Sequence, residues 1–93
     1  MSRYRITYTD AYNRRAAKFF KRHSTVLGQY EKAMRLLELD PFHPSLRLHK
    51  LEGRMNELHS VSINLSYRVV IHFLIAGDEI MPVDIGDHDK VYR

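Results

Sequence analysis

The chain has 93 residues, 44% of them apolar, which suffices for one domain with a modest core and is too short for two. It has no cysteine, so disulfides and thiolate metal sites are excluded. Its net charge of +4 is unevenly placed: residues 1–50 carry eleven Lys/Arg and four Asp/Glu, whereas residues 51–93 carry four and seven. The first part is thus +7 and the second −3, and clustered positive charge favours a polyanionic partner, because each neutralised phosphate releases counterions.

Hydropathy adds two expectations about where the protein works. No apolar run approaches the roughly 20 residues of a membrane span. The start of the chain lacks the apolar core of a signal peptide. We therefore expect residues 1–93 to form a single cytoplasmic domain that has no contact with a membrane.

The first half of the chain predicts one strand followed by two helices. Residues 3–9 alternate between apolar and polar positions, as in a half-buried strand. Asp10 can cap a helix with an apolar stripe and basic outer faces. Ser24 or Thr25 can cap a second helix, which ends before Pro41 because proline disfavours the α conformation in the residue before it. With no long linker between them, the helices are expected to form an antiparallel hairpin.

The second half switches to a period of two and predicts three strands. They cover residues 57–64, 67–75 and 79–86, with a turn before the last of them. The order β-α-α-β-β-β predicts an α+β fold, in which one sheet carries the helix pair on one face and leaves the other partly open. The inward positions expected of the last strand are Met81, Val83 and Ile85.

Arg68 is the most informative residue of the predicted central strand. Its parity places it on the face opposite the apolar Val69, together with His72. A guanidinium carries a permanent charge and a planar donor fork that suits phosphate. The alternative is a structural arginine paired with an acid such as Glu57 or Asp84.

Two further groups could carry chemistry. The C-terminal run 86–93 contains an imidazole, a phenol and two cations, of which the first two can exchange protons. Before the second predicted strand, His49 could be a general base and Lys50 a phosphate clamp. The alternatives are a frayed polar tail and a solvated loop. No histidine pair has the spacing of a zinc site, so we expect neither metal nor cofactor.

Four segments resemble, in order, motifs of the RelE/ParE toxins of type II toxin–antitoxin systems, and most of all those of the RelE and HigB branches. The segments are residues 48–53 (LHKLEG), 57–63 (ELHSVSI), 67–71 (YRVVI) and 86–93 (GDHDKVYR). The family shows an L-x-G turn, a W-S-x-R-I strand, a Y-R-hydrophobic strand and a G-H-x-x-x-V-Y ending. The motifs span about the last half of the chain.

The resemblance implies a curved antiparallel sheet packed on an N-terminal helical hairpin. It also implies a basic cleft that docks in the ribosomal A site, where RNase members cleave mRNA until an antitoxin encoded beside them blocks it. Arg68 then matches the arginine at the scissile phosphate, His88 and Tyr92 match C-terminal acid–base positions, and His49 matches a proposed base. The residues of this chain that we then expect to bind mRNA and ribosomal RNA are Lys50, Arg54, His72, Lys90 and Arg93.

The chain also departs from the family. Members commonly carry a basic residue at the position of Ser62, and Asp87 and Asp89 flank His88 with acids that repel phosphate. Three hypotheses therefore remain open: a ribosome-dependent mRNA endonuclease that uses the RNA 2′-hydroxyl without a metal, a ParE-like DNA gyrase poison, and a degenerate toxin that only binds its antitoxin.

Overall fold

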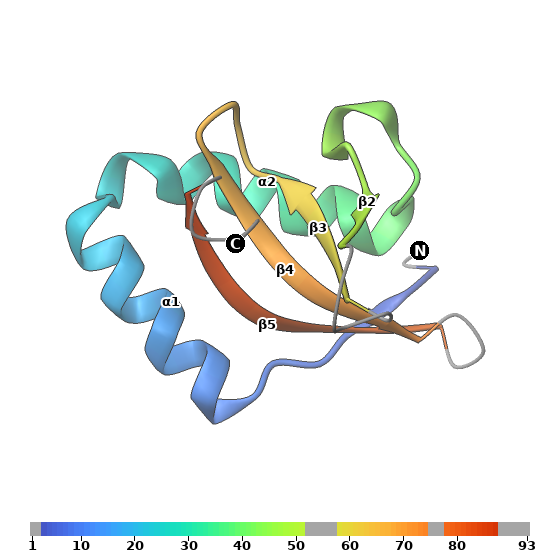
Figure 1. Cartoon of the computed structure of the whole chain (residues 1–93), viewed down its shortest axis with the longest axis horizontal. Helices are drawn as coiled ribbons and strands as arrows, with labels where there is room; N and C mark the ends of the chain where they lie inside the picture. Colours follow the sequence, from blue (N-terminus) through green and yellow to red (C-terminus); the bar gives the residue numbers. More distant parts are fainter. Residues whose placement is uncertain (1–2, 52–57, 75–77, 88–93) are drawn as a thin grey trace.

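A computed structural model describes residues 3–51, 58–74 and 78–87 of the chain (Figure 1). The helices are α1 (Asp10–Arg22) and α2 (Leu27–Leu39), accompanied by short 3-10 turns η1 (Ser24–Val26) and η2 (Pro44–Leu46). The strands are β1 (Arg5–Ile6), β2 (His49–Lys50), β3 (Leu58–Ser62), β4 (Tyr67–Leu74) and β5 (Glu79–Asp87).

The five strands form one sheet in the order β1-β5-β4-β3-β2. The pairs β2–β3, β3–β4 and β4–β5 are antiparallel. This confirms the predicted α+β architecture. Two details differ: β1 is only two residues long and runs parallel to β5, with Arg5 opposite Glu79, and His49 and Lys50 form an edge strand instead of a loop.

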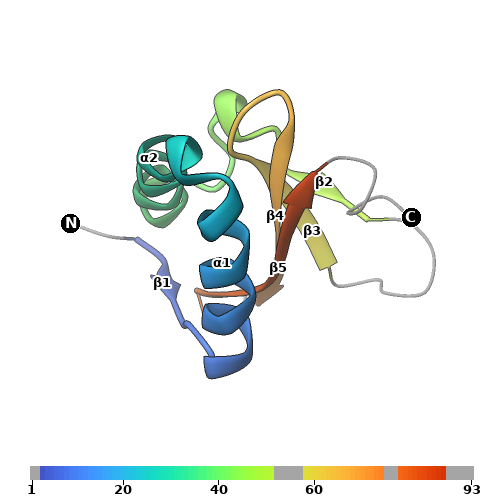
Figure 2. The same cartoon turned by 90° about the vertical axis from the view of Figure 1, so that its left-hand side faces the viewer.

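Both helices lie against one face of the sheet, as the view along its edge shows (Figure 2). Val69, Ile71 and Phe73 of β4 are buried in the core between sheet and helices, as their alternation predicted. Leu37 of α2 joins them and has no exposed surface. Burial of each such aliphatic side chain contributes about 1.5–3 kcal/mol to folding. The predicted helix-bearing face of the central strand is therefore confirmed.

An irregularity in the β4–β5 ladder changes which side chains of β5 face the core. Between Val70 and Ile71 the register shifts, so β5 contributes one extra residue there. Met81 and Val83, predicted to point inward, are consequently only half-buried, and that part of the prediction is wrong. Arg15 of α1 donates a hydrogen bond to the Val83 carbonyl at 3.0 Å. The buried positions of β5 are Ile80, Pro82 and Ile85.

The helix starts also differ from the prediction. Thr9, and not Asp10, caps α1, because its hydroxyl accepts a hydrogen bond from the Tyr12 amide at 3.1 Å. Neither Ser24 nor Thr25 caps α2, since both lie in η1 and α2 begins after it without a side-chain cap. The end of α2 before Asp40 is as predicted.

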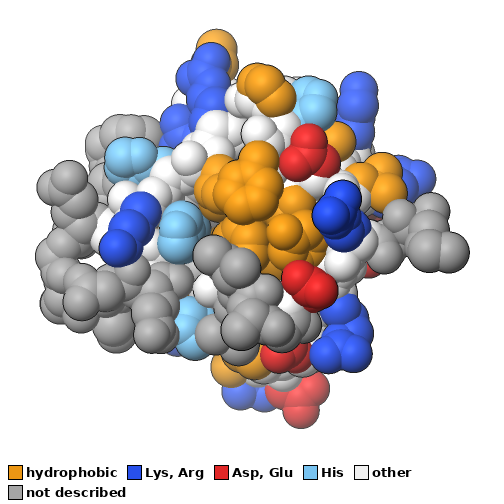
Figure 3. Space-filling view, turned by 90° about the vertical axis from the view of Figure 1, so that its right-hand side faces the viewer, with side chains coloured by type: hydrophobic (Ala, Val, Ile, Leu, Met, Phe, Trp, Pro, Cys, Tyr) orange, Lys and Arg blue, Asp and Glu red, His pale blue; other side chains and the backbone are white. Residues whose placement is uncertain are grey.

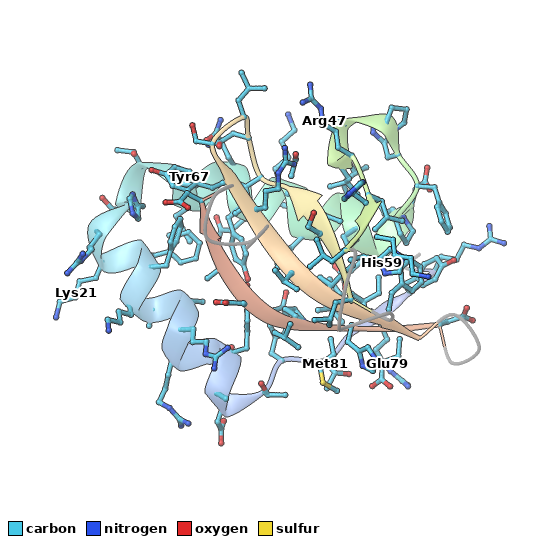
Figure 4. The ribbon with its side chains drawn as sticks, viewed as in Figure 1. Lys21, Arg47, His59, Tyr67, Glu79 and Met81 are labelled. Carbon is cyan, nitrogen blue, oxygen red and sulfur yellow. The ribbon has the colours of Figure 1, made fainter. Side chains whose placement is uncertain are left out.

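Two surfaces stand out. The exposed side of α1 is basic, and Lys21 projects from it away from the sheet (Figure 4). Apolar side chains gather in the centre of the face drawn in Figure 3. Phe42, which is 61% exposed, stacks on Phe73 with ring centroids 5.9 Å apart. In the part of the chain that the structure describes, no helix is long and apolar enough to cross a membrane.

Candidate functional site

Arg68 lies on the face of the sheet that the helices leave free. It follows Tyr67 at the start of β4, and its neighbour Val69 points the other way into the core. Ser62 of β3 and Gly86 of β5 lie directly opposite it on the two flanking strands. The predicted orientation is therefore correct. The predicted exposure is wrong, because only 8% of the Arg68 surface is accessible to solvent.

Ser62 explains how a guanidinium is held at this position. The Arg68 Nη1 atom donates a hydrogen bond to the Ser62 hydroxyl, which is itself buried. A buried charged donor needs such an acceptor, because losing it leaves a costly desolvated group. The sequence presented Ser62 only as the loss of a basic residue. In the structure its short side chain makes room for the guanidinium and orients it.

The signal that could have revealed this pair is the register of the β3–β4 hairpin. Ile63 donates its amide to the Tyr67 carbonyl at 2.9 Å, which closes the turn and fixes the pairing of the strands. Every pair in this ladder then follows by counting back from the turn, so Ser62 falls opposite Arg68. Directly opposed residues of an antiparallel pair project from the same face.

The same counting places His49 on the helix-free face. His49 of β2 lies opposite Ser60 of β3, which lies opposite Val70, two residues beyond Arg68. With strands about 4.8 Å apart and a rise of about 3.3 Å per residue, the Cα atoms of His49 and Arg68 are about 12 Å apart. His49 is exposed, whereas Arg68 is buried, so the two side chains share one face of the sheet but differ in their access to solvent.

His72 and Lys50 occupy different positions with respect to this face. His72, half-buried, shares the face with Arg68 four residues away on β4 and lies opposite Leu58. Lys50 is exposed and lies opposite His59, whose ring contacts Phe73 of the core at 5.8 Å. The pleat therefore directs Lys50 to the side opposite that of His49. The helix-free face thus brings together His49, Arg68 and His72, but not Lys50.

The remaining predicted site residues lie outside the described part of the chain. They are Arg54, His88, Lys90, Tyr92 and Arg93. Asp87, the last residue of β5, lies opposite Tyr67, next to the pair formed by Arg68 and Gly86. The point at which the chain leaves β5 is therefore beside Arg68. Among residues 3–51, 58–74 and 78–87, no group of three or more His, Asp or Glu side chains could hold a metal ion.

Comparison with known proteins shows which fold the chain shares. No protein-family model and no curated protein matches the sequence. Solved structures do match. The E. coli DinJ–YafQ toxin–antitoxin complex has a TM-score of 0.75 at 13% identity, covering 98% of this chain and 99% of that one. The Mycobacterium tuberculosis toxin–antitoxin complex RelBE2 has a TM-score of 0.69 at 15% identity, covering 95% and 94%.

A third structure, the YoeB/ParE toxin from Agrobacterium tumefaciens, has a TM-score of 0.70 at 18% identity and covers 90% of this chain and 98% of that one. The chain has the RelE/ParE-like toxin fold. The likeness extends over nearly the whole of each chain, so the two helices and the sheet are those of the toxin fold. At these identities it concerns the fold alone, and the chemistry must come from the side chains of this chain.

Proposed function

We propose that this protein is the toxin of a toxin–antitoxin module and that it cleaves mRNA in the ribosomal A site. The observation that carries the proposal is the guanidinium of Arg68 on the helix-free face, bonded to Ser62, with His49 on the same face two strands away. The toxin fold of the chain supports it, because the similar structures include toxins bound to antitoxins. The cognate partner is then an antitoxin polypeptide, and ribosomal RNA forms part of the docking surface.

The chemistry requires three groups and no external reactant. The RNA 2′-oxygen attacks the adjacent phosphorus, and its proton passes to a base. The bond from phosphorus to the 5′-oxygen breaks, and an acid supplies a proton to that leaving oxygen. The products are a 2′,3′-cyclic phosphate and a 5′-hydroxyl. The nucleophile belongs to the substrate and is already close, so no metal is needed to generate it.

Roles for the side chains follow from their chemistry. Arg68 stabilises the charge that develops on the phosphorane, as a fixed cation in a water-poor site does. His49 or His88 is the base, and Tyr92 or His88 is the acid. The RNA backbone is bound by cations and an imidazole around this centre: Arg54, His72, Lys90 and Arg93. Lys50, which points to the other side of the sheet, is not part of this group.

The low exposure of Arg68 adds a condition. A phosphate contacts a guanidinium through its N–H groups, and one of those of Arg68 is already donated to Ser62. We propose that the remaining donors of Arg68 become accessible when RNA binds. Because Ser62 holds one edge of the planar fork, the other edge keeps a fixed direction.

The burial of Arg68 favours a second candidate function as well. A toxin that only binds its antitoxin would retain Arg68 as a structural group of the sheet, bonded to Ser62 and shielded from solvent. A gyrase poison would likewise need no acid–base groups beside it. These readings differ from the nuclease in one measurable respect, since neither cuts RNA.

The test is a reconstituted translation reaction with a defined codon in the A site. We expect the wild-type protein to cut the mRNA there and Arg68→Met to cut about 100-fold more slowly, which is the scale of losing one transition-state cation. Arg14→Met is the matched control, because Arg14 is an exposed arginine of α1. It should cut at nearly the wild-type rate.

Two results would overturn the proposal. Intact mRNA with gyrase-dependent DNA breaks would identify a gyrase poison. Intact mRNA and intact DNA, with tight binding of the antitoxin, would identify a toxin that has lost its catalytic activity.

A further inference from the structure

A second feature lies in the helix layer, on the other side of the sheet from Arg68. It is an open pocket between α2 and the segment that joins β1 to α1, with a volume of about 520 Å³. This is within the roughly 300–1,000 Å³ of ligand pockets. Its lining, called here the tyrosine–glutamate pocket, consists of Tyr8, Tyr30, Glu31, Met34, Arg35 and Glu38.

The aromatic wall of this pocket is fixed by a chain of contacting phenols. The hydroxyls of Tyr12 and Tyr30 are hydrogen-bonded at 2.9 Å, and the ring of Tyr8 lies 6.2 Å from that of Tyr12. Tyr12 is buried, whereas Tyr8 is 47% exposed. The Tyr8 ring is therefore anchored from behind and presents its surface to an incoming group.

The acidic wall comes from one face of α2. Glu31, Arg35 and Glu38 are spaced by four and three residues, so they lie along one side of the helix. Glu38 is close enough to Tyr8 to contribute, after burial and the neighbouring Tyr30, to a rise in the pKa of the Tyr8 phenol to about 12. Two carboxylates and one guanidinium give the lining a net negative charge on a chain whose net charge is +4.

We propose that the tyrosine–glutamate pocket binds an arginine side chain of a partner polypeptide. A guanidinium stacks on tyrosine faces and donates in pairs to carboxylates, so it uses both walls at once. An ammonium group would use the carboxylates without the planar stacking. Arg35 is exposed and on a flexible stem, so it can turn away and leave Glu31 and Glu38 to the incoming group.

The partner that fits best is the antitoxin, and in this choice the inference rests on the proposed function. The pocket itself does not depend on RNA cleavage, because α2 lies on the helix side of the sheet (Figure 2), whereas Arg68 lies on the other face. An antitoxin segment held there would leave the helix-free face to a second segment of the same partner. The pocket can be tested with the protein alone.

The probe is a five-residue peptide, acetyl-Gly-Leu-Arg-Leu-Gly-amide, titrated into isotopically labelled protein and followed by amide chemical shifts. Matched peptides carry citrulline or glutamate in place of arginine; citrulline keeps the shape of arginine and removes its charge. We expect the arginine peptide to shift the amides of Glu31, Arg35 and Glu38. It should bind several-fold more tightly than the citrulline peptide, and the glutamate peptide should not bind.

Variants of the protein locate the effect. Glu31→Gln and Glu38→Gln should each weaken binding of the arginine peptide by about two- to fivefold, the scale of a partly exposed ion pair. Tyr8→Leu should weaken it, whereas Tyr8→Phe keeps the ring and should not. Asp78→Asn is the matched control, since Asp78 is an exposed acid on the hairpin before β5. It should leave binding unchanged.

The proposal fails if the arginine and citrulline peptides bind equally, if the glutamate peptide binds better, or if the shifted amides lie on β3 and β4. Glu31 is exposed, so Glu31→Gln reports on the pocket even if a change at Tyr8 disturbs the fold. These outcomes are independent of mRNA cleavage. Loss of this site would leave the proposed nuclease intact, and loss of the nuclease would leave this site intact.

Discussion

The two faces of the sheet carry polar groups of opposite character, built in different ways. On the helix-free face the buried guanidinium of Arg68 donates a hydrogen bond to the Ser62 hydroxyl across a β ladder. On the helix side the tyrosine–glutamate pocket is an open surface whose carboxylates belong to a single helix. The first arrangement depends on a fixed strand register and the second on how α2 meets the β1–α1 segment. A substitution at the buried charged site should therefore change the free energy of unfolding, whereas a substitution at the exposed site should hardly change it.

The largest expected difference is in the free energy of unfolding when one polar group on each face is substituted. Ser62→Ala removes one hydrogen-bond acceptor of the buried Arg68 guanidinium, and we expect the free energy of unfolding to fall by about 1–3 kcal/mol, the cost of losing a hydrogen bond to a buried charged group. Glu31→Gln in the pocket should change it by less than about 0.5 kcal/mol, as exposed substitutions do. Urea unfolding of both variants measures the difference. Ser62→Thr keeps a hydroxyl and should recover much of the loss.

Equal effects of Ser62→Ala and Glu31→Gln on the free energy of unfolding would contradict the expected difference between the two faces. They would mean that the Arg68–Ser62 hydrogen bond contributes no more to the fold than a solvated carboxylate. A more stable Ser62→Ala variant would indicate that Arg68 is not held at this position in solution.

At high pH we expect a smaller change in the free energy of unfolding, which comes from tyrosines on the helix side of the sheet. Burial is the main cause that raises the pKa of Tyr8 from 10.0 to about 12, and burial also raises the pKa values of Tyr12 and Tyr30. The folded protein thus binds these protons more tightly than the unfolded chain. The contribution of the Tyr8 proton to stability is complete below pH 10 and is lost as the pH rises through about 12.

The measurement is the free energy of unfolding on either side of pH 10, together with the ultraviolet absorbance of tyrosinate. Tyr8→Phe should make the decline at high pH shallower without abolishing it, because Tyr12 and Tyr30 remain. An identical decline in wild type and Tyr8→Phe would show that Tyr8 titrates as a solvated phenol. The Tyr8 ring would then not form a fixed aromatic wall of the pocket.

The sequence predicted well what depends on alternation along one element. The inward Val69 and the outward Arg68 follow from the pleat of a strand, and the end of α2 follows from the steric effect of Pro41. The antiparallel order of β3, β4 and β5 could be anticipated because three consecutive strands joined by short turns pair with their neighbours, whereas the places of β1 and β2 could not.

The features that the sequence did not predict depend on a choice between adjacent residues of similar chemistry, or on contacts between segments far apart in the chain. Thr9 and Asp10 are adjacent residues that can both cap a helix, and the structure places the cap at Thr9. The bulge opposite Val70 shifted the pattern of β5 by one residue, which alternation does not reveal. The burial of Arg68 and the pocket beside Tyr8 arise from packing of segments far apart in the chain.

The most direct test of the central claim uses the substrate instead of the protein. In the reconstituted A-site reaction, one mRNA carries ribose throughout and a second lacks the 2′-hydroxyl only at the nucleotide before the cut. If the helix-free face promotes attack by that hydroxyl, the wild-type protein will cut the first mRNA and leave the second intact at that position. Cleavage of both at the same site and rate would contradict the account, because the nucleophile would then not be the RNA itself.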